Sequence, residues 1–264
     1  MKYNNEFSTI DTQEKAYLLG QIYGDGYNSV TPAKFLMASI NTDTPLYKNL
    51  NELFPFLKLK TYLSHSNMVY LENYEKAFCL DLSKLGMLSN KTKNDITGEF
   101  HFPNLDKHLI PHFIRGYFDA DGSAWYPSRI RSRNCLHIEF GCATKNFLKQ
   151  IQHILDEQDI HFTYTERFKK AGNGKLYKSY ILFSSCYETS KKFADFIYKD
   201  ASIYLPYKYD LCYRPKILRT PVYIEYGTCP YCSSTHIIKK GIRNNKQRLH
   251  CVNCNKRFTK EMPT

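Results

Sequence analysis

The sequence lacks long apolar runs. No stretch approaches the ~18 residues of a membrane span, and the polar start, residues 1–6, is not followed by the apolar core of a signal peptide. These absences predict no membrane partner and no secretion. Nine cysteines in a chain without such a signal indicate a reducing compartment, where thiols bind metals rather than form disulfides. We therefore expect a cytoplasmic protein of a bacterial or phage-infected cell, with an organelle as the alternative.

Acidic residues are missing from residues 229–260, which contain eight Lys or Arg and no Asp or Glu. Residues 1–228 carry 29 basic and 24 acidic residues, a net charge of +5, whereas the whole chain carries +12. The positive excess near the C-terminus predicts an anionic partner, and a basic soluble enzyme is the simpler alternative. Because 42% of the residues are hydrophobic and 15% are aromatic, the composition excludes extensive disorder.

Two C-x₂-C pairs lie in this basic segment with 18 residues between them, a spacing typical of a zinc ribbon. The four thiolates would complete a tetrahedral site, and a segment of about 35 residues would depend on the Zn²⁺ for its folding. Four unrelated free cysteines are the alternative. The predicted ligands are Cys229, Cys232, Cys251 and Cys254. The other cysteines lack paired spacing and are predicted to be buried packing residues: Cys79, Cys135, Cys142, Cys186 and Cys212.

Basic residues between the two pairs form a positive strip similar to that of zinc ribbons in transposases and other DNA-binding proteins. Such a strip suits contact with phosphates and reads little sequence. A ribbon that docks on another protein is the alternative. The predicted phosphate contacts are Lys239, Lys240, Arg243, Lys246 and Arg248.

The remainder of the chain reads as two halves with the same order of elements. Apolar periodicity predicts helices over 13–25, 45–54, 82–88, 111–121, 146–157 and 187–198. Alternating or short apolar runs predict strands over 35–40, 57–63, 69–71, 123–126, 136–142, 161–168 and 177–184. This internal duplication predicts an α+β, pseudo-two-fold monomer.

Polar stretches mark the expected domain boundaries. Residues 90–107 would join the two halves, and residues 214–226, with two prolines, would lead to the ribbon. The predicted domains are a first half with linker, a second half, a linker and a zinc ribbon, over 1–107, 108–213, 214–226 and 227–264.

One nine-residue phrase occurs in both halves, as LLGQIYGDG over 18–26 and as IRGYFDADG over 114–122. Each reads as an apolar helix that ends in Asp-Gly, with small residues four apart on one face. If the two helices pack through these faces, Asp25 and Asp121 meet at one end. A carboxylate at a helix C-terminus opposes the helix dipole, and two nearby carboxylates repel, so Mg²⁺ is the expected companion. Asp119 has no acidic counterpart, since Tyr23 occupies the matching position, and is predicted to be structural.

The two phrases resemble the paired motifs of LAGLIDADG homing endonucleases in their two-motif, single-chain form. The similarity covers roughly residues 13–212 and is closest around the second motif, HFIRGYFDADGS over 112–123. The resemblance implies two αββαββα halves whose saddle-shaped sheets lie in the DNA major groove. It also implies that the last Asp of each motif binds Mg²⁺ and that each site cuts one strand, leaving short 3′ overhangs.

A lysine after the last helix of each half, in the same family, helps to position water or to stabilise charge. Lys91 and Lys208 occupy comparable places here, and a solvated surface lysine is an equally weighted alternative for each. Basic residues of the strands are candidates for DNA contact, although each alone is more often a solvated charge. These residues are Lys34, Lys58, Lys60, Arg129, Arg131, Arg133, Arg167, Lys169, Lys175 and Lys178.

The first functional hypothesis is therefore a Mg²⁺-dependent, site-specific endonuclease that acts on double-stranded DNA as a monomer. A catalytically inactive DNA- or RNA-binding protein of the same fold, such as an intron maturase or a transcription regulator, is the alternative. Retention of both carboxylates favours cleavage. A transposase-like protein is a weaker third hypothesis, because the chain lacks a suitably spaced acidic triad.

Overall fold

The computed structural model describes residues 2–62, 67–87, 100–127, 135–170, 174, 176–213, 227–244 and 246–261. The chain divides into two compact units, Met1–Lys216 and Ile217–Thr264. The predicted linker over 214–226 lies outside the described residues. None of the helices in these ranges combines the length and the hydrophobicity that a membrane crossing requires.

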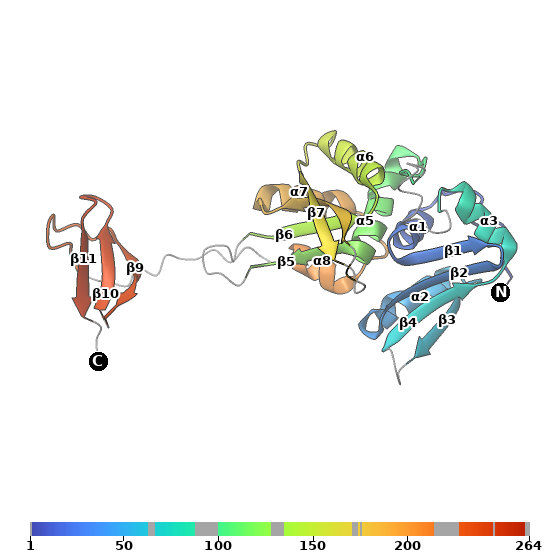
Figure 1. Cartoon of the computed structure of the whole chain (residues 1–264), viewed down its shortest axis with the longest axis horizontal. Helices are drawn as coiled ribbons and strands as arrows, with labels where there is room; N and C mark the ends of the chain where they lie inside the picture. The colour runs from blue at the N-terminus through green and yellow to red at the C-terminus, as the bar shows by residue number, and fades with distance from the viewer. Residues whose placement is uncertain are drawn as a thin grey trace. The chain divides into compact units, whose positions relative to one another are not determined.

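The first half of the larger unit follows the order αββαββα (Figure 1). Its four strands form one antiparallel sheet in the order β1-β2-β4-β3. Helices α2 and α3 contact this sheet. The elements are α1 (Gln13–Asp25), β1 (Gly26–Val30), β2 (Ala33–Ile40), α2 (Thr44–Leu53), β3 (Lys58–Tyr62), β4 (Met68–Asn73) and α3 (Lys76–Lys84), with a 3₁₀ turn at Asn41–Asp43.

The second half repeats this order and adds a helix at its end. Its sheet has the order β5-β6-β8-β7, which is the same relative order as in the first half. The elements are α5 (Ile110–Asp121), β5 (Gly122–Trp125), β6 (His137–Cys142), α6 (Lys145–Asp156), β7 (Thr163–Lys170), β8 (Leu176–Ser184), α7 (Tyr187–Tyr198) and α8 (Pro206–Tyr213), after a 3₁₀ turn at Lys107–Leu109. The predicted α+β duplication is confirmed.

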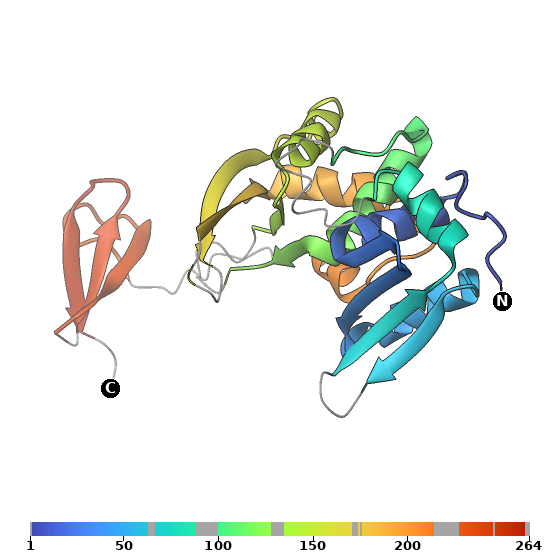
Figure 2. The same ribbon diagram turned by 45° about the vertical axis from the view of Figure 1, so that its right-hand side comes forward.

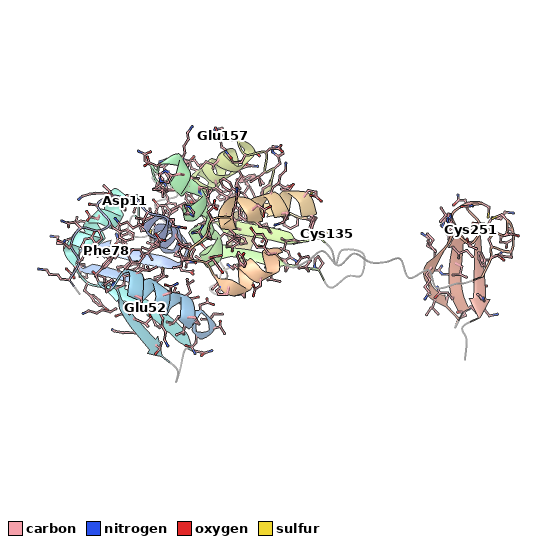
Figure 3. All side chains as sticks on the ribbon, turned by 180° about the vertical axis from the view of Figure 1, so that it is seen from behind. Asp11, Glu52, Phe78, Cys135, Glu157 and Cys251 are labelled. Atoms are coloured by element: carbon pink, nitrogen blue, oxygen red, sulfur yellow. The ribbon has the colours of Figure 1, made fainter. Side chains whose placement is uncertain are left out.

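Helices α1 and α5 lie side by side at the centre of this unit, between the two sheets (Figures 1 and 2). A single buried core extends through both halves. In the first half, Phe78, labelled in Figure 3, is fully buried and contacts the rings of Phe35 and Phe56 at centroid distances of 5.2 and 5.1 Å. At the junction, the ring of Tyr23 contacts Phe100 and Phe113.

Several predictions about single elements were wrong. The third helix of the first half was expected over 82–88 but spans Lys76–Lys84, because Gly86 adopts a left-handed φ of +92° that ends the helix. Strand β1 was not predicted, since its Gly, Asn and Ser suggest a turn. Helix α8 was also missed. The predicted linker over 90–107 is described only from residue 100, and this part contributes the buried Phe100 to the core.

The cysteines outside the ribbon only partly match the prediction of buried packing. Cys79 and Cys212 are buried, and Cys135 and Cys142 are half-buried. Cys186 is exposed, so the prediction was wrong for this residue. It occupies the N-cap position of α7, in the short turn that follows β8, and a residue at such a turn faces solvent.

The smaller unit contains an antiparallel three-stranded sheet in the order β11-β10-β9. Its strands are β9 (Ile237–Arg243), β10 (Lys246–Cys251) and β11 (Arg257–Glu261). Leu249 and Cys251 of the central strand are fully buried, which is a small core for a unit of this size. The four cysteines of the two C-x₂-C pairs lie together in this unit.

Candidate functional site

The glycines of the two repeated phrases set the distance between α1 and α5. A Cβ atom added to Gly116 would lie 2.0 Å from the carbonyl oxygen of Tyr17, and one added to Gly20 would lie 2.1 Å from that of Phe113. Both distances are far below van der Waals contact, so the helix backbones cross directly at the two glycines. The sequence-based prediction that the helices pack through their small residues is confirmed.

The crossing of the two helices also determines where the two motif carboxylates lie. A Cβ atom on Gly24 would lie 2.4 Å from the Cβ of Ala120 and 3.4 Å from the Oδ2 atom of Asp121. Asp25 is the next residue after Gly24, so both carboxylates lie at the C-terminal end of the helix pair. Both residues are exposed. Each is followed by a glycine that begins a strand.

Both carboxylates raise the pKa of the same buried phenol, that of Tyr117. Burial raises the pKa of Tyr117 well above its usual value, and the neighbouring Cys142, Asp121 and Asp25 raise it further. Paired carboxylate oxygens are the ligands that Mg²⁺ prefers, because the cation relieves their repulsion and takes its remaining ligands from water or phosphate. The residues at this end of the helices therefore fit a hard divalent cation.

Lys208, which the family resemblance marked as a candidate catalytic residue, is only 2% exposed. Its ammonium donates hydrogen bonds to the carbonyl oxygens of Phe118, Asp119 and Gly122 at 2.8, 2.7 and 2.7 Å. These carbonyls belong to the last turn of α5 and the first residue of β5. Burial lowers the pKa of Lys208, while Asp119, Asp25 and Asp121 oppose that shift. Lys208 therefore ties together the backbone on both sides of Asp121.

Asp119 is buried beside this lysine and has a structural role, as its lack of an acidic counterpart predicted. Its carboxylate accepts hydrogen bonds from the hydroxyls of Tyr17 and Tyr198 at 2.9 and 2.6 Å and from the backbone N–H of Leu205 at 2.8 Å. Burial raises the pKa of Asp119, and Lys208 is the largest of the influences that lower it. The carboxylate thus links α1, α5, α7 and the start of α8.

Arg115 is a buried site residue that the sequence reasoning missed. Its guanidinium donates to the carbonyl oxygens of Ile203 and Ile197, both at 2.9 Å, which fixes the segment that leads into α8. Leu19 and Tyr23 stand in the first half at the positions of Arg115 and Asp119. An arginine inside an apolar helix repeat was the signal that could have identified it. Lys91, the matching lysine of the first half, lies outside the described residues.

The predicted DNA-contact lysines of the first sheet share one face. Lys34 lies opposite Ser29, while Lys58 and Lys60 lie opposite Glu72 and Tyr70. Strand alternation places all three on the side away from the buried Phe35 and Leu71. The Nζ atom of Lys60 forms an ion pair with Glu72 at 2.5 Å.

The predicted DNA contacts of the second sheet lie on different faces of the sheet. On the face away from the core, Arg167 forms a two-point ion pair with Glu139, both N···O distances being 3.2 Å. Lys178 lies on the opposite face, which carries α6, and pairs with Glu166. Lys169 lies opposite Tyr177 in the register. Four predicted contacts lie outside the described residues: Arg129, Arg131, Arg133 and Lys175.

An aromatic cluster on the same open face was missed. The ring centroid of Trp125 lies 5.3 Å from that of His137 and 6.3 Å from that of Phe183. The centroids of His137 and Phe183 are 5.5 Å apart. Trp125 is 36% exposed. Three strands contribute one ring each, so only the sheet register brings them together.

The four cysteines of the smaller unit form a compact cluster. Their sulfur atoms all lie within 4.8 Å of one another, with Cys229–Cys254 at 3.7 Å and Cys232–Cys251 at 3.5 Å. A tetrahedral zinc site with Zn–S bonds of about 2.3 Å requires S···S distances of roughly 3.8 Å. The backbone N–H of Tyr231 also donates to the sulfur of Cys229. The thiol set therefore fits a structural Zn²⁺ ion.

Comparison with known proteins finds a family model that matches part of the second half. Residues 110–197 match the family model of the LAGLIDADG-like domain, which confirms the resemblance expected from the second motif. None of the curated proteins matches the chain.

Solved structures similar to this one share little sequence with it. They include mesophilic variants of the homing endonuclease I-DmoI (16% identity, 74% of this chain and 98% of that chain, TM-score 0.48). The LAGLIDADG meganuclease I-AabMI bound to uncleaved DNA has 15% identity over 74% and 86% of the two chains, with a TM-score of 0.46. The N-terminal LAGLIDADG domain of WhiA has 16% identity over 73% and 88%, with a TM-score of 0.43.

Proposed function

We propose that the protein is a site-specific DNA endonuclease that hydrolyses one phosphodiester bond in each strand of a long target. The pair of exposed carboxylates, Asp25 and Asp121, at one end of two closely packed helices carries this proposal. The family match over 110–197 supports it, because Asp121 lies within the matched segment. By the resemblance of the two motifs, the products would carry short 3′ overhangs, and the gene would belong to an intron or another mobile element.

Asp25 and Asp121 would hold Mg²⁺, which supplies charge stabilisation at the scissile phosphate and activates the attacking water. The chain's own residues keep the two carboxylates in place. Gly20 and Gly116 allow the helices to approach, and Lys208 fixes the backbone on both sides of Asp121. We assign Lys208 this positioning role in the proposed mechanism, and we retain Lys91 as the candidate lysine of the first half.

The open faces of the two sheets would contact the DNA. Lys34, Lys58 and Lys60 lie on this face of the first sheet, and Arg167 and the Trp125 cluster lie on that of the second. Lysine and arginine suit phosphates and guanine edges, and an aromatic ring suits the thymine methyl group. We leave Lys178 out of the contact set because it lies on the face that carries α6. The sequence-based contacts at Arg129, Arg131, Arg133, Lys169 and Lys175 stay in the proposal.

The direct test is cleavage of a randomised DNA library by the zinc-loaded chain, first with Mg²⁺ and then with Ca²⁺, followed by sequencing of the ends. Discrete cuts with short 3′ overhangs in Mg²⁺ would support the proposal. Specific retention of DNA without cuts in either ion would overturn it in favour of a binding protein.

Replacing Asp121 by Asn should separate catalysis from binding. The variant keeps the size of the side chain but removes a ligand charge, so cleavage should fall by about 100-fold or more, while DNA affinity in Ca²⁺ should stay within about threefold. Asp106→Asn, which removes an exposed carboxylate at the 3₁₀ turn before α5, is the matched control and should cut normally. Normal cleavage by the Asp121→Asn chain would refute the assigned mechanism.

A nucleic-acid-binding protein without nuclease activity is the second candidate. The observation that favours it is Lys208, whose three protons are all donated to backbone carbonyls. A catalytic lysine would need at least one of them for water or phosphate. In this case the chain would retain duplex DNA or intron RNA in both ions, and Asp121→Asn would change nothing.

A further inference from the structure

The ribbon sheet has two unlike faces, although its basic residues form one strip in the sequence. On one face the side chains of Gln247, Leu249 and Cys251 are buried. The other face carries alternate residues of the same strands, among them Lys240, Arg248 and Arg257, and all three are exposed. The sequence-based strip is therefore split, since Lys239 pairs with Leu249 and belongs to the first face.

The exposed face gathers cations from all three strands. Arg248 lies opposite Thr259 and the neighbouring His250 lies opposite Arg257, so β10 and β11 present these residues on the same side. Lys240 of β9 lies beside Arg248 at an irregularity in the pairing of β9 with β10. Arg257 was not among the predicted contacts because it follows the second cysteine pair. We call Lys240, Arg248 and Arg257 the ribbon cation row.

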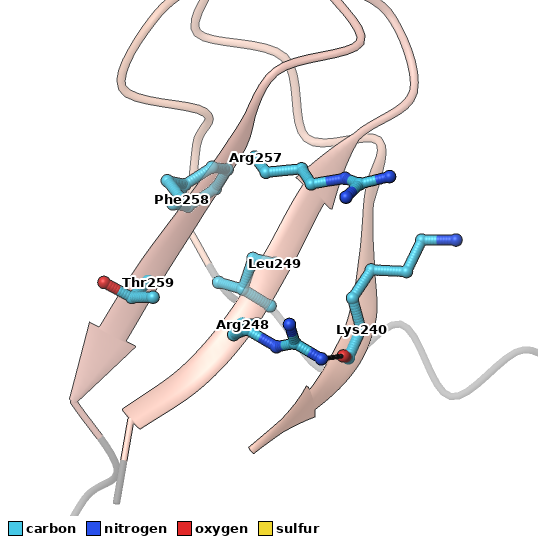
Figure 4. A pocket seen from close by; sticks show the side chains of 6 residues that line it. All are labelled: Lys240, Arg248, Leu249, Arg257, Phe258 and Thr259. Carbon is cyan, nitrogen blue, oxygen red and sulfur yellow. Dashed lines mark hydrogen bonds between the residues drawn. The ribbon is translucent and has the colours of Figure 1, made fainter. Parts of the chain in front are cut away.

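A shallow groove of about 270 Å³ runs along this row (Figure 4). The Nη2 atom of Arg248 donates to the carbonyl oxygen of Lys240 at 2.9 Å, which holds the guanidinium against the sheet. The side chain of Gln247 donates to the carbonyls of Gly241 and Arg248, also at 2.9 Å, and closes the pairing irregularity from the buried side. Gly241 has a φ of +89°, so the irregularity is built into the backbone. The guanidinium of Arg248, at the centre of the row, is thus held in place before any ligand binds.

The cations of the row form no ion pair with their neighbours: among the described residues, no ion pair involves Lys240, Arg248 or Arg257. Residues 229–260 contain no acid, and Glu261, on the same face, lies opposite Lys246 at the other end of β11 from Arg257. Adjacent strands are spaced by about 4.8 Å, so three strands place cations across roughly 10 Å. Over that length one DNA strand presents about three phosphates.

We infer that the ribbon cation row binds the sugar–phosphate backbone of duplex DNA, independently of sequence, and that the opposite face of the ribbon does not. The inference rests on the proposed function for its choice of DNA as the polyanion. Lysine and arginine contacts to phosphate orient a protein without reading bases, so the row would raise affinity for any duplex. Each such contact releases a counterion, which gives the row a measurable signature in the salt dependence of binding.

The experiment compares two charge-matched variants of the full, zinc-loaded chain. Lys240→Gln with Arg257→Gln removes two cations from the row, and Lys239→Gln with Lys260→Gln removes two from the opposite face. Arg248 stays unchanged because its hydrogen bond supports the sheet. Affinity for a target-free duplex is measured in Ca²⁺ from 50 to 200 mM salt, after zinc content and circular dichroism confirm that both variants are folded.

The row variant should lower the salt slope of log K by about 1.8, so that it loses roughly tenfold less affinity than the unmodified chain over this range. The opposite-face variant should keep the original slope. Equal slopes for the two variants would overturn the inference, and so would a row variant that loses affinity only for single-stranded RNA. Cleavage is scored separately in Mg²⁺: an inactive chain with the expected slopes refutes the nuclease alone, whereas a chain that cuts but shows equal slopes refutes the row alone.

Discussion

At the scale of single residues, the unusual feature is Lys208, a buried lysine whose ammonium group binds backbone carbonyls inside the protein. The ammonium of Lys208 contacts the carbonyls of Phe118 and Asp119 in the last turn of α5, where the helix dipole attracts a cation, and the carbonyl of Gly122 at the start of β5. It also lies near the buried Asp119, which lowers the cost of burying either charge. Asp121 lies between the residues that Lys208 holds, so the lysine fixes the backbone that carries this carboxylate.

Replacing Lys208 by Met should therefore destabilise the fold. The change keeps the bulk of the side chain but removes three hydrogen bonds to backbone carbonyls and a buried cation that offsets the charge of Asp119, a loss of about 3 kcal/mol. Urea unfolding at pH 7 measures this loss. Lys58→Met, the same replacement at an exposed strand position, should stay within about 0.5 kcal/mol.

A Lys208→Met chain as stable as the unmodified protein, but unable to cut, would instead indicate a direct catalytic role. This outcome would restore the role that the family resemblance implied.

The sequence was sufficient to place Asp25 and Asp121 at the same end of the paired helices, because the two residues occupy the same position in a repeated motif. It was not sufficient for Arg115 or for the burial of Lys208. Their partners lie more than 80 positions away, at Ile203 in one case and at Phe118 in the other. Which charges become buried depends on where distant carbonyls come to lie, and local periodicity does not carry that information.

At the scale of elements, the crossing of α1 and α5 tolerates almost no added volume. Gly116→Ala would normally stabilise a helix by about 1 kcal/mol, but here the new methyl group would lie 2.0 Å from the carbonyl of Tyr17. We expect a net loss of about 3 kcal/mol in the free energy of unfolding, with a larger loss for Gly116→Ser.

Denaturant titration of both variants checks this order. Unchanged or increased stability of Gly116→Ala would show that the helices do not cross at this glycine.

The elements with strong periodicity were predicted well, and those with boundaries set by turns were not. Helix α1 was expected over 13–25 and spans Gln13–Asp25. Helix α3 was displaced because its end is fixed by the left-handed Gly86, and β1 was missed because its residues favour turns. Strand β1 forms through its pairing with β2. A prediction made from the residues of one short segment does not take account of such pairing with another segment.

At the scale of the whole molecule, the two units should respond differently to loss of metal. The smaller unit buries few apolar side chains, so a Zn²⁺ ion held by four cysteines would supply most of its stability, about 10 kcal/mol or more. A strong chelator should therefore unfold residues 227–261 and leave the unit Met1–Lys216 folded.

Amide resonances of the two units, recorded before and after chelation, distinguish these responses. The untreated protein should contain one zinc ion per chain. Cys251→Ser should reproduce the effect of the chelator, and persistence of the β9–β11 resonances without metal would contradict the assignment.

Two buried charges of the second half, Arg115 and Asp119, have no copies in the first, where Leu19 and Tyr23 take their places. In a symmetric homodimer every substitution appears twice, so a change that suits one subunit is imposed on the other. A tandem duplication in one chain removes this coupling. Each half can then mutate separately, and natural selection can adapt the two halves to partners that are themselves asymmetric.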